Sequence, residues 1–281
     1  MTSILPVTGS DFLRMSIRRL ESMILKKHIK QILLPVYKDI SSTIFNNKKS
    51  KYIYLKLATF LSTHGISPIF SPSAASIKER WQKQGEDGAL TNPKIYMKEN
   101  KSIPELFKDV LPYLDKNGPV LEIGCNVGRS LNYLHAHGYR NLTGIEIGKE
   151  AIELMKITFP EMYHNSKIIT GDATEVIKRL NTSEFDLVFC HSVLINIPPR
   201  NNRIFKEMAR VSRKFILILE NEGSYIAYPR NFKKMFEKQG YKMIVNKIFT
   251  GACSSLPVPF ETKHIYENNT IRLFVKDKSR S

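Results

Sequence analysis

Cysteine is scarce in this chain of 281 residues, and the few cysteines do not cluster. The three, Cys125, Cys190 and Cys253, have no Cys-x-x-Cys spacing, which argues against a disulfide scaffold or a zinc cluster and suits a reducing cytosol. The chain also lacks an apolar run of about 18 or more residues, so we expect no membrane span. Asp11 and several arginines interrupt any signal-peptide layout near the start. These absences predict a cytoplasmic protein.

Acidic residues are few relative to basic ones. The chain has 43 Lys and Arg against 26 Asp and Glu, a formal net charge of +17. Residues 1–80 hold 13 of the basic residues and 4 of the acidic ones, which is about half of the excess. Such an excess suits anionic partners: nucleic acid, phosphorylated substrates or an anionic membrane surface. A solvated basic face with no bound partner explains the same charge equally well.

Residues 1–75 are predicted to form a basic helical N-terminal extension. Apolar residues recur at helical spacing over about 10–34 and 51–63, and a weaker helix is expected at 36–45. The extension either packs on the main domain as an ordinary appendage or is peripheral to a membrane through a basic amphipathic surface. Nucleic acid is not favoured as a partner, since no basic–aromatic alternation or nucleic-acid-binding module is present.

After a linker over 76–100, helical stretches alternate with apolar strand-like runs. The expected strands are 119–124, 142–147, 167–170, 185–190, 215–220, 241–249 and 270–276. The expected helices are 101–115, 128–137, 149–158, 173–181, 199–211 and 230–239. The pattern predicts an α/β domain over 101–281 with a doubly wound, seven-stranded, mostly parallel sheet. No helix separates the last two strands, so we expect one antiparallel strand.

The stretch 120–130 carries the clearest ligand-binding pattern. Apolar residues run into a turn that contains Gly124 and Gly128, and an amphipathic helix follows. The two glycines let the backbone approach a ligand closely, and a helix N-terminus offers free N–H groups. A nicotinamide-binding turn is the nearest rival, but its Gly-x-Gly-x-x-Gly pattern is absent here.

Polar residues stand where the expected strands end. In an open α/β sheet the ligand binds outside the carboxyl ends of the strands. These ends carry Glu122, Glu146, Asp172, the pair His191–Ser192 and Glu220. Each acid alone is explained as a helix cap or a solvated charge. Several of them at one edge of the sheet indicate a binding site.

Residues 100–276 resemble a class I S-adenosylmethionine-dependent methyltransferase, whereas residues 1–75 do not. The resemblance is carried by Val120–Gly128, Gly144–Glu146, Gly171–Ala173 and Phe185–Ile197, at the intervals usual for that family. It implies S-adenosylmethionine as the cofactor and methyl transfer to an acceptor. In such enzymes the segment before the first helix often closes the cofactor site, so 76–100 is expected to form a lid.

The resemblance also implies a role for each strand end. Glu122 would organise the ammonium group of the cofactor, Glu146 would accept both ribose hydroxyls, and Asp172 would accept from the adenine amino group. The complete set implied to bind the cofactor is Glu122, Gly124, Cys125, Asn126, Gly128, Glu146, Ile147, Asp172, Ala173, His191 and Ser192. Asn126 departs from the glycine that the family often has there, and asparagine tolerates the left-handed backbone better than most residues.

Methyl transfer needs in-line alignment, and an alcohol or amine acceptor also needs a base. His191 is the first candidate for the base, because its reference pKa lies near neutrality, and Glu222 is the second. Packing at the strand tip is the alternative explanation for His191. No acidic pair follows the strand at 185–190, so no metal is expected.

Contacts to the substrate are expected outside the cofactor frame. The loop after the strand at 215–220 is rich in hydroxyls, aromatics and charge, and it supplies Tyr225, Tyr228 and Arg230 as candidates. The lid supplies Trp81 and Tyr96, although burial of the indole as a plain anchor explains Trp81 as well.

These features predict a methyltransferase that acts on an oxygen atom of a small-molecule or glycan-type acceptor. One alternative is a non-catalytic protein that keeps the fold as a scaffold or binding module. Another is an RNA methyltransferase, although residues 196–199 lack the aromatic residue of an Asn/Asp-Pro-Pro-Tyr-like signature.

Overall fold

The computed structural model describes residues 48–68, 71, 73–83, 91–97, 102–221, 228–249, 269–277 and 279. The chain divides into two compact units, Met1–Tyr54 and Leu55–Ser281. Of the first unit, residues 48–54 are described, and they begin helix α2 (Lys48–Thr63). This helix confirms the one expected at 51–63. The helices expected at 10–34 and 36–45 lie outside the described residues.

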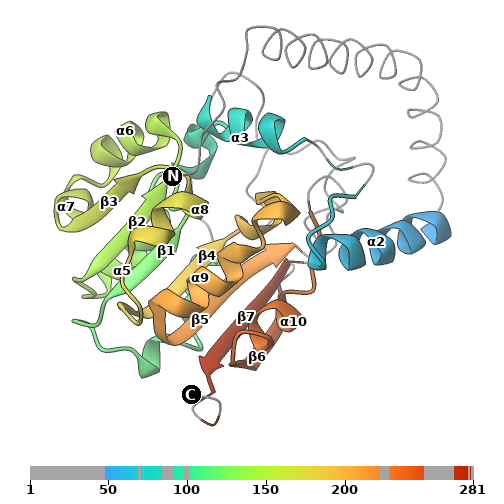
Figure 1. The fold of residues 1–281 in the computed structure, drawn as a ribbon. Coiled ribbons are helices and arrows are strands. Elements are labelled where there is room, and N and C mark those ends of the chain that lie inside the picture. Colours follow the sequence, from blue (N-terminus) through green and yellow to red (C-terminus); the bar gives the residue numbers. More distant parts are fainter. Residues whose placement is uncertain are drawn as a thin grey trace, which may run out of the picture. The chain divides into compact units, whose positions relative to one another are not determined.

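A seven-stranded sheet forms the second unit and confirms the predicted fold class. Within the described part of the chain its strands lie in the order β3-β2-β1-β4-β5-β7-β6 (Figure 1). Their bounds are β1 (Val120–Ile123), β2 (Leu142–Glu146), β3 (Ser166–Thr170), β4 (Phe185–His191), β5 (Ser212–Asn221), β6 (Tyr241–Phe249) and β7 (Asn269–Lys276). Strand β7 pairs antiparallel with both β5 and β6, and the other neighbouring strands are parallel. The last strand in the chain therefore inserts between β5 and β6.

Helices cover both faces of this sheet (Figure 1). The α-helices are α3 (Ala74–Gln82), α4 (Ser102–Phe107), α5 (Arg129–Ala136), α6 (Lys149–Thr158), α7 (Pro160–His164), α8 (Ala173–Val176), α9 (Arg203–Val211) and α10 (Phe232–Glu237). Short 3-10 helices are η1 (Pro93–Met97), η2 (Leu111–Tyr113), η3 (Ile177–Arg179), η4 (Leu194–Asn196) and η5 (Pro199–Asn201). None of the helices in the described ranges is long and apolar enough to cross a membrane.

Alternate side chains of the central strands supply two separate cores. Val188 and Cys190 of β4 belong to a buried cluster with residues of α8, α9 and α10. Leu187 and Phe189 of the same strand belong to a second cluster with residues of α4, α5, α6 and α7. Successive residues of a strand point to opposite faces, and a parallel sheet with both faces covered needs apolar residues on both. This is why these strands are continuous apolar runs in the sequence.

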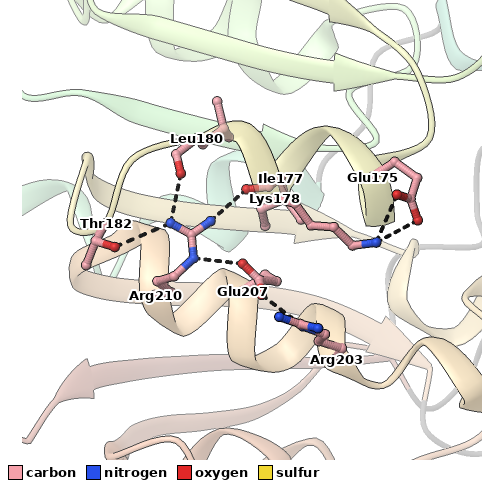
Figure 2. Close-up of polar contacts among 8 residues, drawn as sticks. All are labelled: Glu175, Ile177, Lys178, Leu180, Thr182, Arg203, Glu207 and Arg210. Carbon is pink, nitrogen blue, oxygen red and sulfur yellow. Dashed lines mark hydrogen bonds and ion pairs between the residues drawn. The ribbon is translucent and has the colours of Figure 1, made fainter. Parts of the chain in front are cut away.

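Arg210 fastens α9 to the segment that follows α8 (Figure 2). Its guanidinium donates to the carbonyl oxygens of Leu180 and Ile177 at 2.8 and 2.9 Å. Its Nε donates to Glu207 at 2.7 Å, and the buried Glu207 carboxylate also pairs with Arg203 at 3.3 Å. These contacts hold α8, which begins directly after Asp172, against the body of the sheet.

Some helices are shorter than the sequence predicts. The helix expected at 101–115 ends at Phe107, and a 3-10 turn follows at Leu111–Tyr113. Pro112 accounts for the break, because proline has no N–H to donate to the carbonyl of Lys108. Helix α7 was not expected, and it begins with Pro160 at a position where proline is favoured.

Candidate active site

A pocket of about 540 Å³ lies at the carboxyl ends of the parallel strands. Its volume is in the range of pockets that bind cofactors and metabolites. Of the described residues expected to bind the cofactor, all except Gly128 line it. The half-buried Trp81 and the half-buried Tyr96 line it as well. Glu222 and Tyr225 lie outside the described residues, so their expected roles stay predictions.

The turn after β1 brings the backbone close to the pocket. Gly124, Asn126 and Gly128 all have positive φ, at 69°, 49° and 77°. Asn126 therefore takes the left-handed conformation expected for it. A Cβ atom on Gly124 would lie only 2.6 Å from Val193 Cγ2, so this position has no space for a side chain. Gly128 instead packs away from the pocket, where a Cβ atom would lie 2.7 Å from Met162.

Glu146 ends β2 and holds this turn in place. Its Oε2 accepts a hydrogen bond from the backbone N–H of Asn126 at 2.7 Å, and its Oε1 accepts from the N–H of Gly148 at 2.7 Å. Burial raises the pKa of Glu146, and these backbone hydrogen bonds oppose the rise. Each carboxylate oxygen has further acceptor capacity. The carboxylate can therefore accept hydrogen bonds from a ligand as well.

Glu122 in β1 has a buried oxygen that lacks a donor. Its side chain is 3% exposed, and Oε2 has no hydrogen-bond partner in the described part of the protein. Burial raises the pKa of Glu122 well above its ordinary value, while Ser130 and the charge of Arg129 lower it. Leaving a buried acceptor unsatisfied costs about 1–3 kcal/mol. A ligand that brings an N–H donor, above all a cationic one, would remove this cost.

Asp172 caps α8 and pairs with the α3 segment. Its Oδ1 accepts from the backbone N–H and the hydroxyl of Thr174 at 3.0 and 2.7 Å. Its Oδ2 lies 2.8 Å from Lys78 Nζ. Burial raises the pKa of Asp172, but the hydrogen bonds from Lys78 and Thr174 outweigh it, and the net pKa lies below the ordinary value. Asp172 is therefore ionised at neutral pH.

His191 ends β4 at the edge of the pocket. Burial, together with the nearby charge of Arg129, lowers the pKa of His191 to about 4. The imidazole is therefore neutral at pH 7 and has a low affinity for a proton. Arg129 begins α5 and also lines the pocket, with its guanidinium carbon 5.3 Å from the centre of the Tyr96 ring. Sequence reasoning missed Arg129, although it directly follows the glycine turn.

The segment 193–197, which follows β4 and borders the pocket, is held from one side by Glu220. The Oε1 atom of Glu220 accepts from the backbone N–H groups of Val193 and Leu194, both at 2.8 Å. Its Oε2 accepts from Ile195 N–H at 3.4 Å. Glu220 is 0% exposed, and burial raises its pKa to about 7 against the opposing effect of these bonds. Sequence reasoning noted Glu220 at a strand end but gave it no role.

Arg230 holds the same segment from the other side. Its guanidinium donates to the carbonyl of Leu194 at 2.8 Å, to the carbonyl of Ile197, and to Asn202 Oδ1 at 2.9 Å. Arg230 is 0% exposed, and burial lowers its pKa to about 10. These bonds occupy the guanidinium with protein acceptors, which differs from the substrate-binding role expected from the sequence.

Tyr228 also differs from the sequence-based expectation. Its side chain is 1% exposed, and its backbone N–H donates to the carbonyl of Ile195 at 2.8 Å. Neither Tyr228 nor Arg230 is among the described residues that line the pocket. Both instead bind the backbone of the segment 193–197, Tyr228 through its N–H group and Arg230 through its guanidinium.

Metal ligands do not gather at this site. Across the described ranges, no group of three His, Cys, Asp or Glu side chains is placed to hold a metal ion. The cysteines in those ranges, Cys125 and Cys190, are buried and free.

Comparison with known proteins agrees with this geometry. Residues 121–215 match a family model described as a methyltransferase domain. This match spans the glycine turn, the ends of β2 and β3, and all of β4. No curated protein is similar in sequence to the chain.

Solved structures share the fold at low sequence identity. Magnesium protoporphyrin IX methyltransferase from Synechocystis PCC 6803 with bound SAM has a TM-score of 0.50 and 15% identity, over 71% of this chain and 90% of that one. The same enzyme with bound SAH has a TM-score of 0.50 and 13% identity, over 72% and 94%. The [4+2]-cyclase SpnF has a TM-score of 0.50 and 11% identity, over 69% and 85%. Residues 121–215 thus match a methyltransferase domain, and the chain has a Rossmann-like methyltransferase fold.

Proposed function

We propose that this protein is an S-adenosylmethionine-dependent methyltransferase that methylates an oxygen atom of a small-molecule or glycan-type acceptor. The observation that carries the proposal is the convergence of Glu122, Glu146 and Asp172 from three neighbouring strand ends on one pocket. When bound, this cofactor supplies a methyl group bonded to a sulfonium sulfur, and the sulfur leaves as a neutral thioether.

The residues of the pocket fit the chemical groups of that cofactor. The unsatisfied Oε2 of Glu122 suits an ammonium group, which would donate a charge-assisted hydrogen bond. The Glu146 carboxylate offers only acceptors, so both hydroxyls of a ribose diol can donate to it. Asp172, which follows β3, would accept a hydrogen bond from the amino group of adenine. Gly124, Cys125 and Asn126 of the turn line the pocket, so their backbone lies beside the ligand space.

We assign removal of the acceptor proton to His191. Its imidazole lines the pocket at the tip of β4 and is neutral at pH 7. Burial lowers its pKa to about 4, which makes it a weaker base than its reference pKa indicates, so the assignment depends on its position in the pocket. A neutral imidazole has a lone pair that can accept a proton from a hydroxyl group as the oxygen attacks. Glu222 stays the second candidate for this role.

Calorimetry with S-adenosylhomocysteine tests the cofactor site without an acceptor. Glu146→Ala should weaken binding at least about 100-fold, because two charged hydrogen bonds of about 1.5–3 kcal/mol each are lost. Glu153→Ala on α6 is the matched control, since its carboxylate is 66% exposed, and it should leave binding within twofold. Unchanged binding by Glu146→Ala, or no binding by the wild-type protein, would refute the proposal.

Transfer of a labelled methyl group separates the remaining alternatives. A protein that binds S-adenosylhomocysteine but labels nothing in an extract of its own cells would be a non-catalytic binding module. Label confined to RNA would identify an RNA methyltransferase instead. Label in a small-molecule or glycan fraction would support the proposed acceptor class.

We further propose that the protein works in the cytoplasm and that the extension 1–75 contacts an anionic membrane surface. The basic excess of this region supports the contact, as do the exposed apolar residues Ile53, Leu57 and Phe60 at helical spacing on α2. Flotation with vesicles of phosphatidylcholine and phosphatidylglycerol tests it. Equal recovery with phosphatidylcholine alone would contradict an electrostatic contact.

A further inference from the structure

The pocket extends beyond β1, β2 and β3, which carry the three acids. It also reaches the carboxyl end of β5 and the start of β7. Asn221 ends β5 and Asn269 begins β7, and the two residues are partners in the antiparallel ladder. Because β7 runs antiparallel, its first residue lies at the same edge as the carboxyl ends of the other strands. Both side chains line the pocket although they are only 3% and 2% exposed.

Asn269 has an acceptor that the protein leaves unsatisfied. Its Oδ1 is buried and has no hydrogen-bond partner among the described residues. An unsatisfied buried acceptor costs about 1–3 kcal/mol, and in a pocket a ligand or an ordered water molecule can supply the missing donor. Glu122 Oε2 is in the same state at the cofactor end of the pocket. The two ends of the pocket thus each present an acceptor that lacks a donor.

The two buried polar side chains of this second end, those of Asn221 and Asn269, are neutral. Asn196 and Asn201 also line the pocket, and so does Arg200, which is exposed to solvent. The carboxylate of Glu220 lies next to Asn221 in the chain, but its oxygens already accept from the backbone of residues 193–195. A carboxamide both donates and accepts without charge, as a hydroxyl group does. An ammonium or carboxylate group would lose its hydration here without gaining a counter-charge from the two buried asparagines.

We propose that Asn221 and Asn269 form the acceptor subsite and bind an uncharged, polyhydroxylated molecule of the carbohydrate type through its hydroxyl groups. This rests on the proposed methyltransferase function, since it assumes that the acids at the other end hold the cofactor. One hydroxyl donates to Asn269 Oδ1 and removes the unsatisfied acceptor. The subsite thereby sets which class of molecule is methylated, while His191 stands between the two ends at the tip of β4.

Asn269→Leu tests the subsite in the full-length protein, with Asn141→Leu as the matched control. Asn141 is exposed and directly precedes β2. It therefore lies at the amino-terminal ends of the parallel strands, away from the pocket at their carboxyl ends. The first readout is stability. Because Leu removes an unsatisfied acceptor, Asn269→Leu should melt at or above the wild-type temperature, whereas a structural asparagine would lower it.

The second readout is ligand binding. S-adenosylhomocysteine affinity should stay within twofold in both variants. Saturation-transfer NMR with the neutral carbohydrate fraction of an extract from the producing cells should show binding to wild type and Asn141→Leu. The signal should fall at least tenfold in Asn269→Leu. Loss of S-adenosylhomocysteine binding by the wild-type protein would instead defeat the proposed function itself.

The third readout is transfer of labelled methyl groups to fractions of the same extract. Label should enter the neutral carbohydrate fraction and fall at least about 100-fold in Asn269→Leu. Label in the anionic, lipid, protein or RNA fraction overturns the proposal, as does unchanged transfer by the variant. Binding of S-adenosylhomocysteine with label in no fraction overturns it as well.

Discussion

Replacing Glu220 should destabilise the protein to a degree that depends on the new side chain and on pH. Glu220→Ala removes the acceptor for two backbone N–H groups, those of Val193 and Leu194, each 2.8 Å from Oε1. Hydrogen bonds to a charged group contribute about 1.5–3 kcal/mol each, so the loss should be about 3–6 kcal/mol. Glu220→Gln keeps an oxygen for both groups, and its cost should be much smaller.

The pH dependence gives a second, signed expectation. Burial raises the pKa of Glu220 from 4.5 to about 7, so between these values the folded protein binds a proton that the unfolded chain releases. Stability from this group is therefore fully present below pH 4.5 and is lost as pH rises through 7. The shift corresponds to about 3 kcal/mol. Glu220→Gln cannot titrate, so its stability relative to wild type should rise by that amount from pH 4.5 to pH 8.

Urea unfolding followed by circular dichroism at both pH values measures these differences. S-adenosylhomocysteine affinity is the companion assay, because Val193 packs against Gly124 in the pocket. Glu220→Ala should bind at least tenfold more weakly, and Glu220→Gln within about threefold of wild type. Equal stabilities of the two variants would refute the role of the hydrogen bonds. A difference between wild type and Glu220→Gln that does not change with pH would refute the buried charge.

Two further perturbations test the pocket. Burial lowers the pKa of His191 from 6.5 to about 4, so the stability that it contributes should be lost as pH falls through that interval. The imidazole resonance should titrate near pH 4 by NMR, and a midpoint near 6.5 would contradict its burial. Gly124→Ala should cost at least about 2 kcal/mol in urea unfolding, because it adds a clash with Val193 to backbone strain. Gly240→Ala is its control, with φ of +81° and no described atom within 4 Å of the new Cβ; equal costs would refute the clash.

The strands and the fold class could be predicted from the sequence, because they depend on the spacing of apolar residues within short segments. Strands buried on both faces read as apolar runs, and β6 has the predicted bounds, Tyr241–Phe249. The point where each apolar run ends also predicts where its strand ends. Glu122 and Glu146 were predicted to lie at a binding site on that basis, and both line the pocket. Asn126 was expected to tolerate a left-handed backbone, and its φ of 49° agrees.

The remaining features depend on contacts between distant parts of the chain. Arg230 looks like a surface arginine in a polar loop, but Leu194 and Ile197 supply the carbonyls that satisfy its buried guanidinium. Nothing in the residues next to Arg230 indicates those acceptors. Asn269 reaches the pocket because β7 enters the sheet in the opposite direction, and its pairing with Asn221 follows only from that register.

The place of β7 also bears on the order in which the protein assembles during synthesis. Domains fold as their chain emerges from the N-terminal side, and β7 follows the other six strands. Until it arrives, β5 has an open edge of unpaired backbone groups, which is the kind of surface that promotes aggregation, and β6 has no neighbour in the sheet. A chain truncated before residue 269 would lack the strand that pairs with β5 and β6, and it would lack Asn269, which lines the pocket. Nascent or clipped chains should therefore depend on chaperones and should not bind an acceptor.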